Sequence, residues 1–310
     1  MVDHEHITLS EEVADALSAG VGVVALESTL LAHGLPASVS LDVAHRLESA
    51  VRAQGAVPAT IAVLGGRARV GLDADQLARV CADDAGLVKL SRRDLAPALA
   101  LGRDGATTVA GTAALAAQAG IGVFATGGLG GVHLAGPGAQ AWDVSADLDV
   151  LASTPVAVVC SGVKSVLDIA ATVEVLETRS IPVLGFGTDS FPSFYLRDSA
   201  FGVPWRVDSA AEAAAVVAAH RDHVPGGSGV LVVNPVPAEH ELDRDLHDRL
   251  LADGMALLRE RGVRGKDVTP VLLEHFHTSS GGASLTANIE LVAGNALVAA
   301  QIAVELAQPR

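Results

Sequence analysis

Residues 21–34 read VGVVALESTLLAHG, and this stretch decides the fold class. It begins with a valine-rich apolar run that continues without polar alternation up to Glu27. Runs of this kind are typical of strands that are covered on both faces, which is the usual environment of parallel strands in α/β proteins. The stretch therefore predicts a buried strand that ends on a carboxylate.

The same kind of apolar run recurs along the chain. Five more predicted strands lie at residues 59–64, 121–126, 156–160, 181–186 and 229–234. Helices are expected between and after them, at 39–54, 108–119, 164–179, 208–220, 239–262 and 284–307. This alternation predicts an α/β protein, with a three-layer α/β/α sandwich around a largely parallel or mixed central sheet. Because no repeat or long linker divides the chain, we expect one domain over residues 1–310.

The composition narrows the function classes. Acidic residues outnumber basic ones by 36 to 21, and the formal charge of -15 disfavours binding to a nucleic-acid backbone. Two cysteines are too few for a disulfide framework, and the N-terminus has no basic head followed by an apolar run, so we expect a cytoplasmic protein. Polar residues such as Asn288 and Asn295 interrupt the apolar C-terminal segment, so no membrane span is expected. The expected partner is a small molecule.

Two residues at strand ends carry the chemistry that we expect, because ligands of open α/β sheets bind beyond the carboxyl ends of strands. Glu27 closes the first strand, where partial burial would raise the pKa of its carboxyl toward the range of proton transfer. Lys164 follows the strand at 156–160 in CSGVKSVLDI, at the expected start of a helix. The helix dipole and burial would there favour a neutral, nucleophilic amine. A hydrogen-bonded structural acid and a surface lysine fit the same positions.

Three further motifs have the composition of ligand-binding segments. The glycines of FATGGLGGVH, residues 124–133, can offer backbone N–H groups to an anion, although the motif is not a dinucleotide fingerprint. Asp143 and Asp147 in WDVSADL suit a hard divalent cation, and Ser145 between them also fits a helix cap. The basic residues of KLSRRD, 89–94, can form either a phosphate clamp or a solvated turn.

Together these motifs resemble the pseudouridine-5′-phosphate glycosidase family. The similarity runs from ALESTLLAHGLP at 25–36 to SLTANIELVAGNA at 284–296 and includes the motifs quoted above. Enzymes of this family reversibly cleave the carbon–carbon bond between ribose and uracil in pseudouridine 5′-phosphate. The products are ribose 5-phosphate and uracil, and the metal is usually manganese. The resemblance also implies an α/β/α fold and a homotrimer.

The resemblance assigns roles position by position. Lys164 matches the nucleophile that forms a Schiff base with C1′ of the opened sugar, and Glu27 matches the proton donor. Asp143 matches the metal-binding aspartate, so one Mn²⁺ per subunit is expected, with Mg²⁺ as an alternative. The other matched pocket positions are Lys89, Val109, Ser145, Ala146 and Asp147, with Thr126, His133 and Asn288 in less specific motifs. Leu134 and His277 depart from the family pattern, where a basic and an acidic residue are usual.

The residues also fit a second enzyme class, a lysine-dependent, metal-assisted aldolase or lyase that acts on another sugar phosphate. A catalytically silent ligand-binding protein is disfavoured, because the matched nucleophile, acid and metal positions are all present. The glycosidase chemistry is consistent with these residues. A carbon-linked base cannot leave as an easy nitrogen anion, so a pair of carboxylates would not suffice. An iminium at C1′ accepts the electrons instead, and protonation of the base carbon releases uracil.

Overall fold

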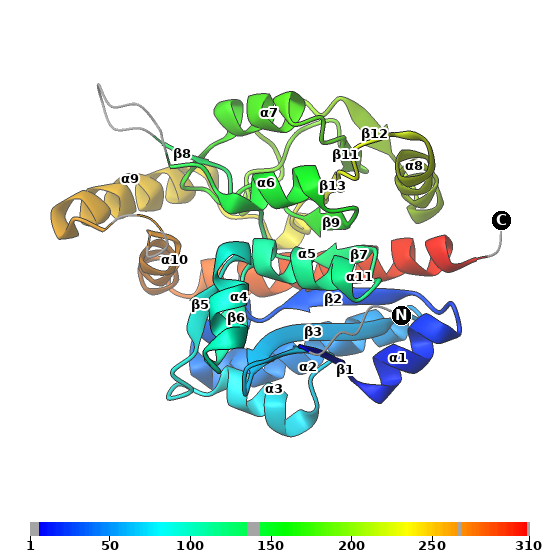
Figure 1. The fold of residues 1–310 in the computed structure, drawn as a ribbon. Helices are drawn as coiled ribbons and strands as arrows, with labels where there is room; N and C mark the ends of the chain where they lie inside the picture. Colours follow the sequence, from blue (N-terminus) through cyan, green and yellow to red (C-terminus); the bar gives the residue numbers. More distant parts are fainter. Residues whose placement is uncertain (1–5, 135–142, 264, 266–267, 309–310) are drawn as a thin grey trace.

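A mixed sheet forms the centre of the molecule in the computed structural model, which describes residues 6–134, 143–263, 265 and 268–308 (Figure 1). Its strands are β1 (Ile7–Leu9), β2 (Val23–Glu27), β3 (Val57–Leu64), β4 (Arg67–Val70), β5 (Val88–Leu90), β6 (Gly105–Thr107), β7 (Val123–Ala125), β9 (Ala157–Cys160), β11 (Val183–Phe186), β12 (Trp205–Val207) and β13 (Val230–Val233). The main path runs β1-β4-β3-β2-β7-β9-β13-β11-β12. From β3 to β12 each neighbouring pair is parallel, whereas β4 and β6 lie antiparallel to β3.

Helices cover both faces of this sheet. They are α1 (Glu11–Ser18), α2 (Ala37–Ala53), α3 (Ala74–Cys81), α4 (Arg92–Ala100), α5 (Val109–Gln118), α6 (Ala146–Ser153), α7 (Ile169–Thr178), α8 (Ala210–His223), α9 (Arg244–Arg261), α10 (Val268–Ser279) and α11 (Ala283–Ala307). In one layer α11 packs between α2 and α8, and in the other α5 packs beside α4 and α6 (Figure 1). The predicted α/β/α sandwich around a mixed sheet is confirmed.

The apolar runs of the sequence form the buried middle of the sheet. All six predicted strands are present, as β2, β3, β7, β9, β11 and β13. One hydrophobic cluster joins them to the helices and reaches from Val13 in α1 to Ala303 in α11. The single domain over residues 1–310 stays a prediction.

Two helices begin later than the sequence pattern predicts. The helix expected from residue 164 begins at Ile169, because the Asp168 carboxylate caps it by accepting the Ala171 N–H at 3.0 Å. The helix expected from residue 239 begins at Arg244, after Asp243 caps it by accepting the Leu246 N–H at 2.9 Å. In both cases an aspartate offers the first turn a hydrogen bond that the apolar periodicity does not reveal.

The last helix, α11, passes a length and composition test for a membrane span, and it is the one helix of the described chain that does. Half of the tested window is nevertheless buried inside the protein. The helix packs on β2, β7 and β9, and its fully buried Asn295 makes hydrogen bonds to Thr126 and Ser161, which directly follow β7 and β9. We therefore interpret α11 as the core helix of one layer.

Candidate active site

A cavity of about 430 Å³ opens where β2, β7 and β9 end. Glu27 closes β2, Gly128 lies in the loop after β7, and Lys164 lies in the loop after β9, and all three line this cavity. The volume is in the range of pockets that bind nucleotide-sized ligands. The other predicted residues that line it are Lys89, Val109, His133, Asp143, Ser145, Ala146, Asp147 and Asn288.

The carboxyl group of Glu27 is held by a neighbour from the next strand. The Thr126 hydroxyl donates a hydrogen bond to Glu27 Oε1, which places Thr126 behind the cavity wall rather than on it. Burial raises the pKa of the Glu27 carboxyl, while the positive charge of Lys164 and the Thr126 hydrogen bond lower it in part. Glu27 therefore keeps its proton to a higher pH than an exposed glutamate does, which suits a proton donor.

A buried amide fixes the strand ends behind Glu27. Asn295 Nδ2 donates to the Thr126 carbonyl oxygen at 2.9 Å and to Ser161 Oγ at 3.1 Å. Its Oδ1 accepts a hydrogen bond from Asn234 Nδ2 at 3.0 Å. These bonds tie together the segments that follow β7, β9 and β13. Sequence reasoning missed this role, and its signal was a polar residue inside an otherwise apolar helix.

A small antiparallel ribbon brings Lys164, His133 and Asp143 to one side of the cavity. In it β8 (Val132–His133) pairs with β10 (Leu167–Asp168), and the His133 N–H donates to the Asp143 carbonyl at 2.9 Å. Burial lowers the pKa of the His133 imidazole; the charge of Asp143 opposes this effect and that of Lys164 adds to it. His133 therefore loses its proton at a lower pH than an exposed histidine does.

The prediction that Lys164 lies at the start of a helix was wrong. Lys164 does not lie at a helix N-terminus, since α7 begins five residues later and is capped by Asp168. Its backbone N–H instead donates to the Leu129 carbonyl at 3.3 Å, in the loop after β7. The dipole of α7 therefore does not act on the amine in the way that the sequence pattern suggested.

Two helices begin at the cavity wall. Thr108 caps α5 and Ser145 caps α6, and the adjoining residues Val109 and Ala146 line the cavity as well. The partial positive charge of a helix N-terminus favours an anion, although the Ala110, Gly111 and Asp147 N–H groups at these starts are already bonded to Asp147, Thr108 and Ser145. The two starts are held side by side by the packing of α5 on α6.

Asp147 takes up two of the backbone N–H groups on this side of the cavity. One carboxylate oxygen accepts the Ala110 N–H at 3.0 Å, and the other accepts the Gly130 N–H at 2.9 Å. A Cβ atom on Gly130 would lie 2.6 Å from Asp147 Oδ2, so the close approach requires glycine. Asp147 therefore joins the start of α5 to the glycine-rich loop.

The basic motif at residues 89–94 is divided between the cavity and the surface. Lys89 and Arg93 line the cavity, and the Arg93 side chain is 85% exposed. Arg92 does not reach the cavity, because its Nη1 donates to Ser153 Oγ at 2.8 Å on α6. The predicted three-residue clamp thus becomes a lysine inside the cavity and an arginine at its rim.

Asn288 presents a buried side-chain amide to the cavity. The residue lines the cavity on α11 and is only 1% exposed. Neither its Oδ1 nor its Nδ2 has a hydrogen-bond partner within the described part of the chain. Buried amides without partners are rare in proteins, so this amide is positioned to pair with a bound molecule.

The acidic end of the cavity has the donor set of a hydrated hard cation. Asp143 is exposed to solvent there, beside His133, while both oxygens of Asp147 accept backbone hydrogen bonds. Within the described ranges no three ligating side chains gather as they would in a closed metal cage. Mg²⁺ and similar ions often bind through one carboxylate, water and substrate oxygens, which Asp143 fits. Trp142, the first residue of its motif, lies outside the described residues.

The opposite wall of the cavity was not predicted from the sequence. It comes from a π-helical turn, η1 (Leu30–Gly34), from Thr269, Pro270 and Leu273 near the start of α10, and from Phe194 in the loop after β11. These segments are distant in sequence, and although η1 lies within the matched stretch at 25–36, none of these residues was expected in the site. π-helical turns occur frequently at functional sites, and η1 directly follows the segment of Glu27.

Comparison with known proteins identifies the family. The sequence model of the family described as indigoidine synthase A-like protein matches residues 12–305. The chain belongs to this family. A pseudouridine-5′-phosphate glycosidase from Streptomyces griseus is 56% identical over 97% of this chain and 93% of its own. One from Clostridium botulinum is 46% identical over 98% of both chains. Relatives this similar over nearly the full length show that the protein is an enzyme of the glycosidase family that its motifs resemble.

Solved structures of the family share the fold. The prealnumycin C-glycosynthase AlnA, solved in complex with ribulose 5-phosphate, superposes with a TM-score of 0.88 at 38% identity and covers 98% of this chain. It is itself matched over 97% of its length. An indigoidine synthase A-like protein from Thermotoga maritima also gives 0.88, at 34% identity over 99% of both chains.

Proposed function

We propose that this enzyme reversibly cleaves the carbon–carbon glycosidic bond of pseudouridine 5′-phosphate, giving ribose 5-phosphate and uracil. The observation that carries the proposal is the cavity that holds both the carboxyl of Glu27, at the end of β2, and the amine of Lys164, in the loop after β9. The names of the relatives support the substrate, and a C-glycosynthase solved with a pentose phosphate supports the type of bond.

The start of α5 and the start of α6 form the proposed phosphate site. Val109 and Ala146 lie in the first turns of these helices, and Ser145 adds a hydroxyl. Lys89 from β5 supplies a positive charge on the same wall. A phosphate bound here would extend the sugar toward Glu27 and Lys164, since both line the same cavity.

The proposed reaction uses the Lys164 amine as nucleophile. Its Nζ bonds to C1′ of the sugar as the C1′–O4′ bond breaks, and O4′ takes up a proton. The C1′–C5 bond to the base then breaks. Its electron pair stays on C5, which receives a proton from Glu27, while the nitrogen lone pair forms a C1′ iminium. Water adds to the iminium and releases the amine and the aldehyde of ribose 5-phosphate.

Glu27 and His133 divide the proton transfers in this scheme. The raised pKa of Glu27 keeps a proton available for C5. The lowered pKa of His133 leaves it neutral, so that it can accept a proton from the attacking amine beside it. In the reverse direction Glu27 accepts the proton from C5 of uracil.

Asp143 is the proposed ligand of a divalent ion, Mn²⁺ or alternatively Mg²⁺. Such an ion would supply a positive charge that polarises an oxygen of the sugar. Asp147 is a positioning residue and not a metal ligand in this proposal, because both of its oxygens accept hydrogen bonds from backbone N–H groups.

The test is to incubate the purified protein and manganese with pseudouridine 5′-phosphate and to separate the products by chromatography. Equal amounts of uracil and ribose 5-phosphate are expected, and a Lys164→Ala variant should form neither. An enzyme that depends on Lys164 and cleaves other sugar phosphates, but not pseudouridine 5′-phosphate, would instead support the aldolase or lyase alternative. Absence of both activities would reject the proposal.

A cytoplasmic homotrimer is the proposed state in the cell. Leu134 and Val144, on the ribbon beside the site, expose 42% and 45% of their surface and could be covered by a second subunit. Sedimentation equilibrium measures the assembly directly. The trimer predicts three times the chain mass of 31.4 kDa, and a monomer would reject it.

A further inference from the structure

Phe194 is the one phenylalanine among the described residues that line the cavity, and its backbone conformation is unusual. Its φ is +56°, in the left-handed region that side chains with a Cβ rarely adopt, and the residue is only 3% exposed. Such conformations cost free energy and persist where the surrounding structure enforces them, often at functional sites. The fold therefore holds this ring in the cavity wall against a local preference.

Several contacts fix the ring in place. The Phe194 N–H donates to the Ser161 carbonyl at 3.0 Å, at the end of β9. The ring meets Tyr195 edge to face at 4.7 Å between centroids, and Tyr195 stacks on Phe276 of α10 at 5.5 Å. Phe194 is thus the cavity end of a row of three aromatic rings that continues through Tyr195 to Phe276 on α10.

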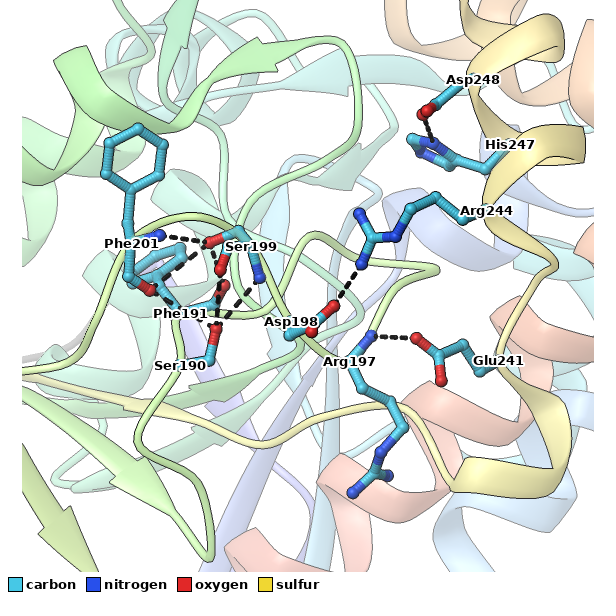
Figure 2. A network of polar contacts seen from close by, with 10 residues as sticks. All are labelled: Ser190, Phe191, Arg197, Asp198, Ser199, Phe201, Glu241, Arg244, His247 and Asp248. Carbon is cyan, nitrogen blue, oxygen red and sulfur yellow. Dashed lines mark hydrogen bonds and ion pairs between the residues drawn. The ribbon is translucent and has the colours of Figure 1, made fainter.

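The loop that carries Phe194 is braced on both sides (Figure 2). On one side the Ser199 hydroxyl donates to the Phe191 carbonyl at 2.6 Å, and its N–H donates to Ser190 Oγ at 3.0 Å. On the other side the loop is attached to the start of α9. There Arg244 pairs with Asp198, and the Arg197 N–H donates to Glu241 at 2.9 Å (Figure 2).

The position of the ring follows from the glycine-rich loop beneath it. A Cβ atom on Gly128 would lie 2.6 Å from Cδ2 of Phe194 and 3.4 Å from Cγ of Lys164. A Cβ atom on Gly127 would lie 3.0 Å from the Val292 side chain of α11 and 3.5 Å from Cε2 of Phe194. The ring therefore lies on the two glycines, between the stem of Lys164 and α11. Asn288 lies one helical turn before Val292 on α11, on the same face.

We propose that Phe194 is a substrate-binding residue whose ring forms the apolar wall for the planar pyrimidine, near the Asn288 amide, which has no hydrogen-bond partner among the described residues. This inference rests on the proposed function, because it names the part of the pocket that takes the base. An aromatic ring stabilises any flat base by stacking, and an amide with a free donor and acceptor discriminates the base by its edge. The sugar phosphate binds at the other end, at the starts of α5 and α6.

The test separates the base from the sugar. Ribose 5-phosphate alone should form the Lys164 Schiff base, which borohydride traps without any base present. In Phe194→Leu the rate of trapping should stay within about twofold of the wild type. The KM for uracil in the synthesis direction, at saturating ribose 5-phosphate, should rise about tenfold to a hundredfold. Phe191→Leu is the matched control, since Phe191 is 1% exposed in the same loop and does not line the cavity.

Each outcome decides the question. An unchanged KM for uracil in Phe194→Leu overturns the proposal. A loss of trapping that equals the loss of uracil coupling also overturns it, because the ring would then support the lysine rather than the base. An equal effect of Phe191→Leu shows a structural role of the loop and overturns it as well. If the wild type itself is not trapped by ribose 5-phosphate, the proposed function fails, and this inference fails with it.

Discussion

Asn288 and Asn295 lie two turns apart on α11, and their replacement by alanine should have opposite effects on stability. Both side chains are buried, at 1% and 0% exposure. Asn295 makes hydrogen bonds to Thr126, Ser161 and Asn234, whereas Asn288 makes none within the described residues. The pair therefore distinguishes an amide that holds the fold from one that is reserved for a ligand.

The magnitudes follow from the groups that each change leaves behind. Asn295→Ala removes the partner of two buried polar groups and of the half-buried Asn234 amide, at about 1 kcal/mol each. Alanine regains about 0.5 kcal/mol through its higher helix propensity, so the net loss in the free energy of unfolding is about 2.5 kcal/mol. Asn288→Ala has the same gain in propensity and breaks no bond. It also removes an unpaired amide, so that variant should be about 1 kcal/mol more stable than the wild type.

The assay is urea unfolding at one fixed protein concentration, followed by circular dichroism, with cleavage of pseudouridine 5′-phosphate measured in parallel. Asn288→Ala should lose at least tenfold in kcat/KM while it gains stability. Asn295→Ala should lose both stability and activity. Equal stability of the two variants, or a loss above about 1 kcal/mol in Asn288→Ala, would refute the reasoning from hydrogen bonds.

Four shorter predictions concern the chemistry. Glu27→Gln should lower kcat for cleavage by about 100-fold or more and leave borohydride trapping with ribose 5-phosphate intact; equal loss of both would count against a donor role. The rate of cleavage should fall as pH rises through the raised pKa of Glu27. Thr126→Val should move this fall to higher pH, because the variant loses a hydrogen bond that favours the ionised carboxylate. A shift to lower pH would contradict the role of Glu27 as proton donor. Chelation should abolish turnover and manganese should restore it, but not in Asp143→Ala, whereas a chelator-resistant enzyme would exclude the metal role. Burial raises the pKa of Cys160 to about 12, so iodoacetamide at pH 8 should leave this thiol unmodified in the native protein, as mass spectrometry of the peptide would show.

The strong signals in the sequence were the apolar runs, and they predicted the middle of the sheet well. β2, β7, β9 and β13 are covered on both faces, so their composition alone marks them as strands. The short strands at the edge were missed. β12 contains Trp205 and Arg206, both exposed, and β5 is a three-residue strand with Lys89 in its middle. Such strands are set by pairing with a neighbour and not by their own pattern.

The candidate site was predictable as far as it lies at strand ends. Glu27 and Lys164 follow strands that the pattern identified, so their convergence in one cavity follows from the topology of a parallel sheet. Phe194 and Asn295 were not predicted as site residues. The left-handed backbone of Phe194 and the hydrogen bonds of Asn295 depend on segments that come together only in the folded chain.

The most direct measurement maps the lysine that bonds to the sugar. The chain contains three lysines, Lys89, Lys164 and Lys266, so peptide mass spectrometry can assign an adduct without ambiguity. Borohydride reduction in the presence of ribose 5-phosphate should add the reduced sugar phosphate to the peptide with Lys164, and Lys164→Ala should abolish the adduct. An adduct on Lys89, or none at all in an enzyme that releases uracil, would contradict the central claim.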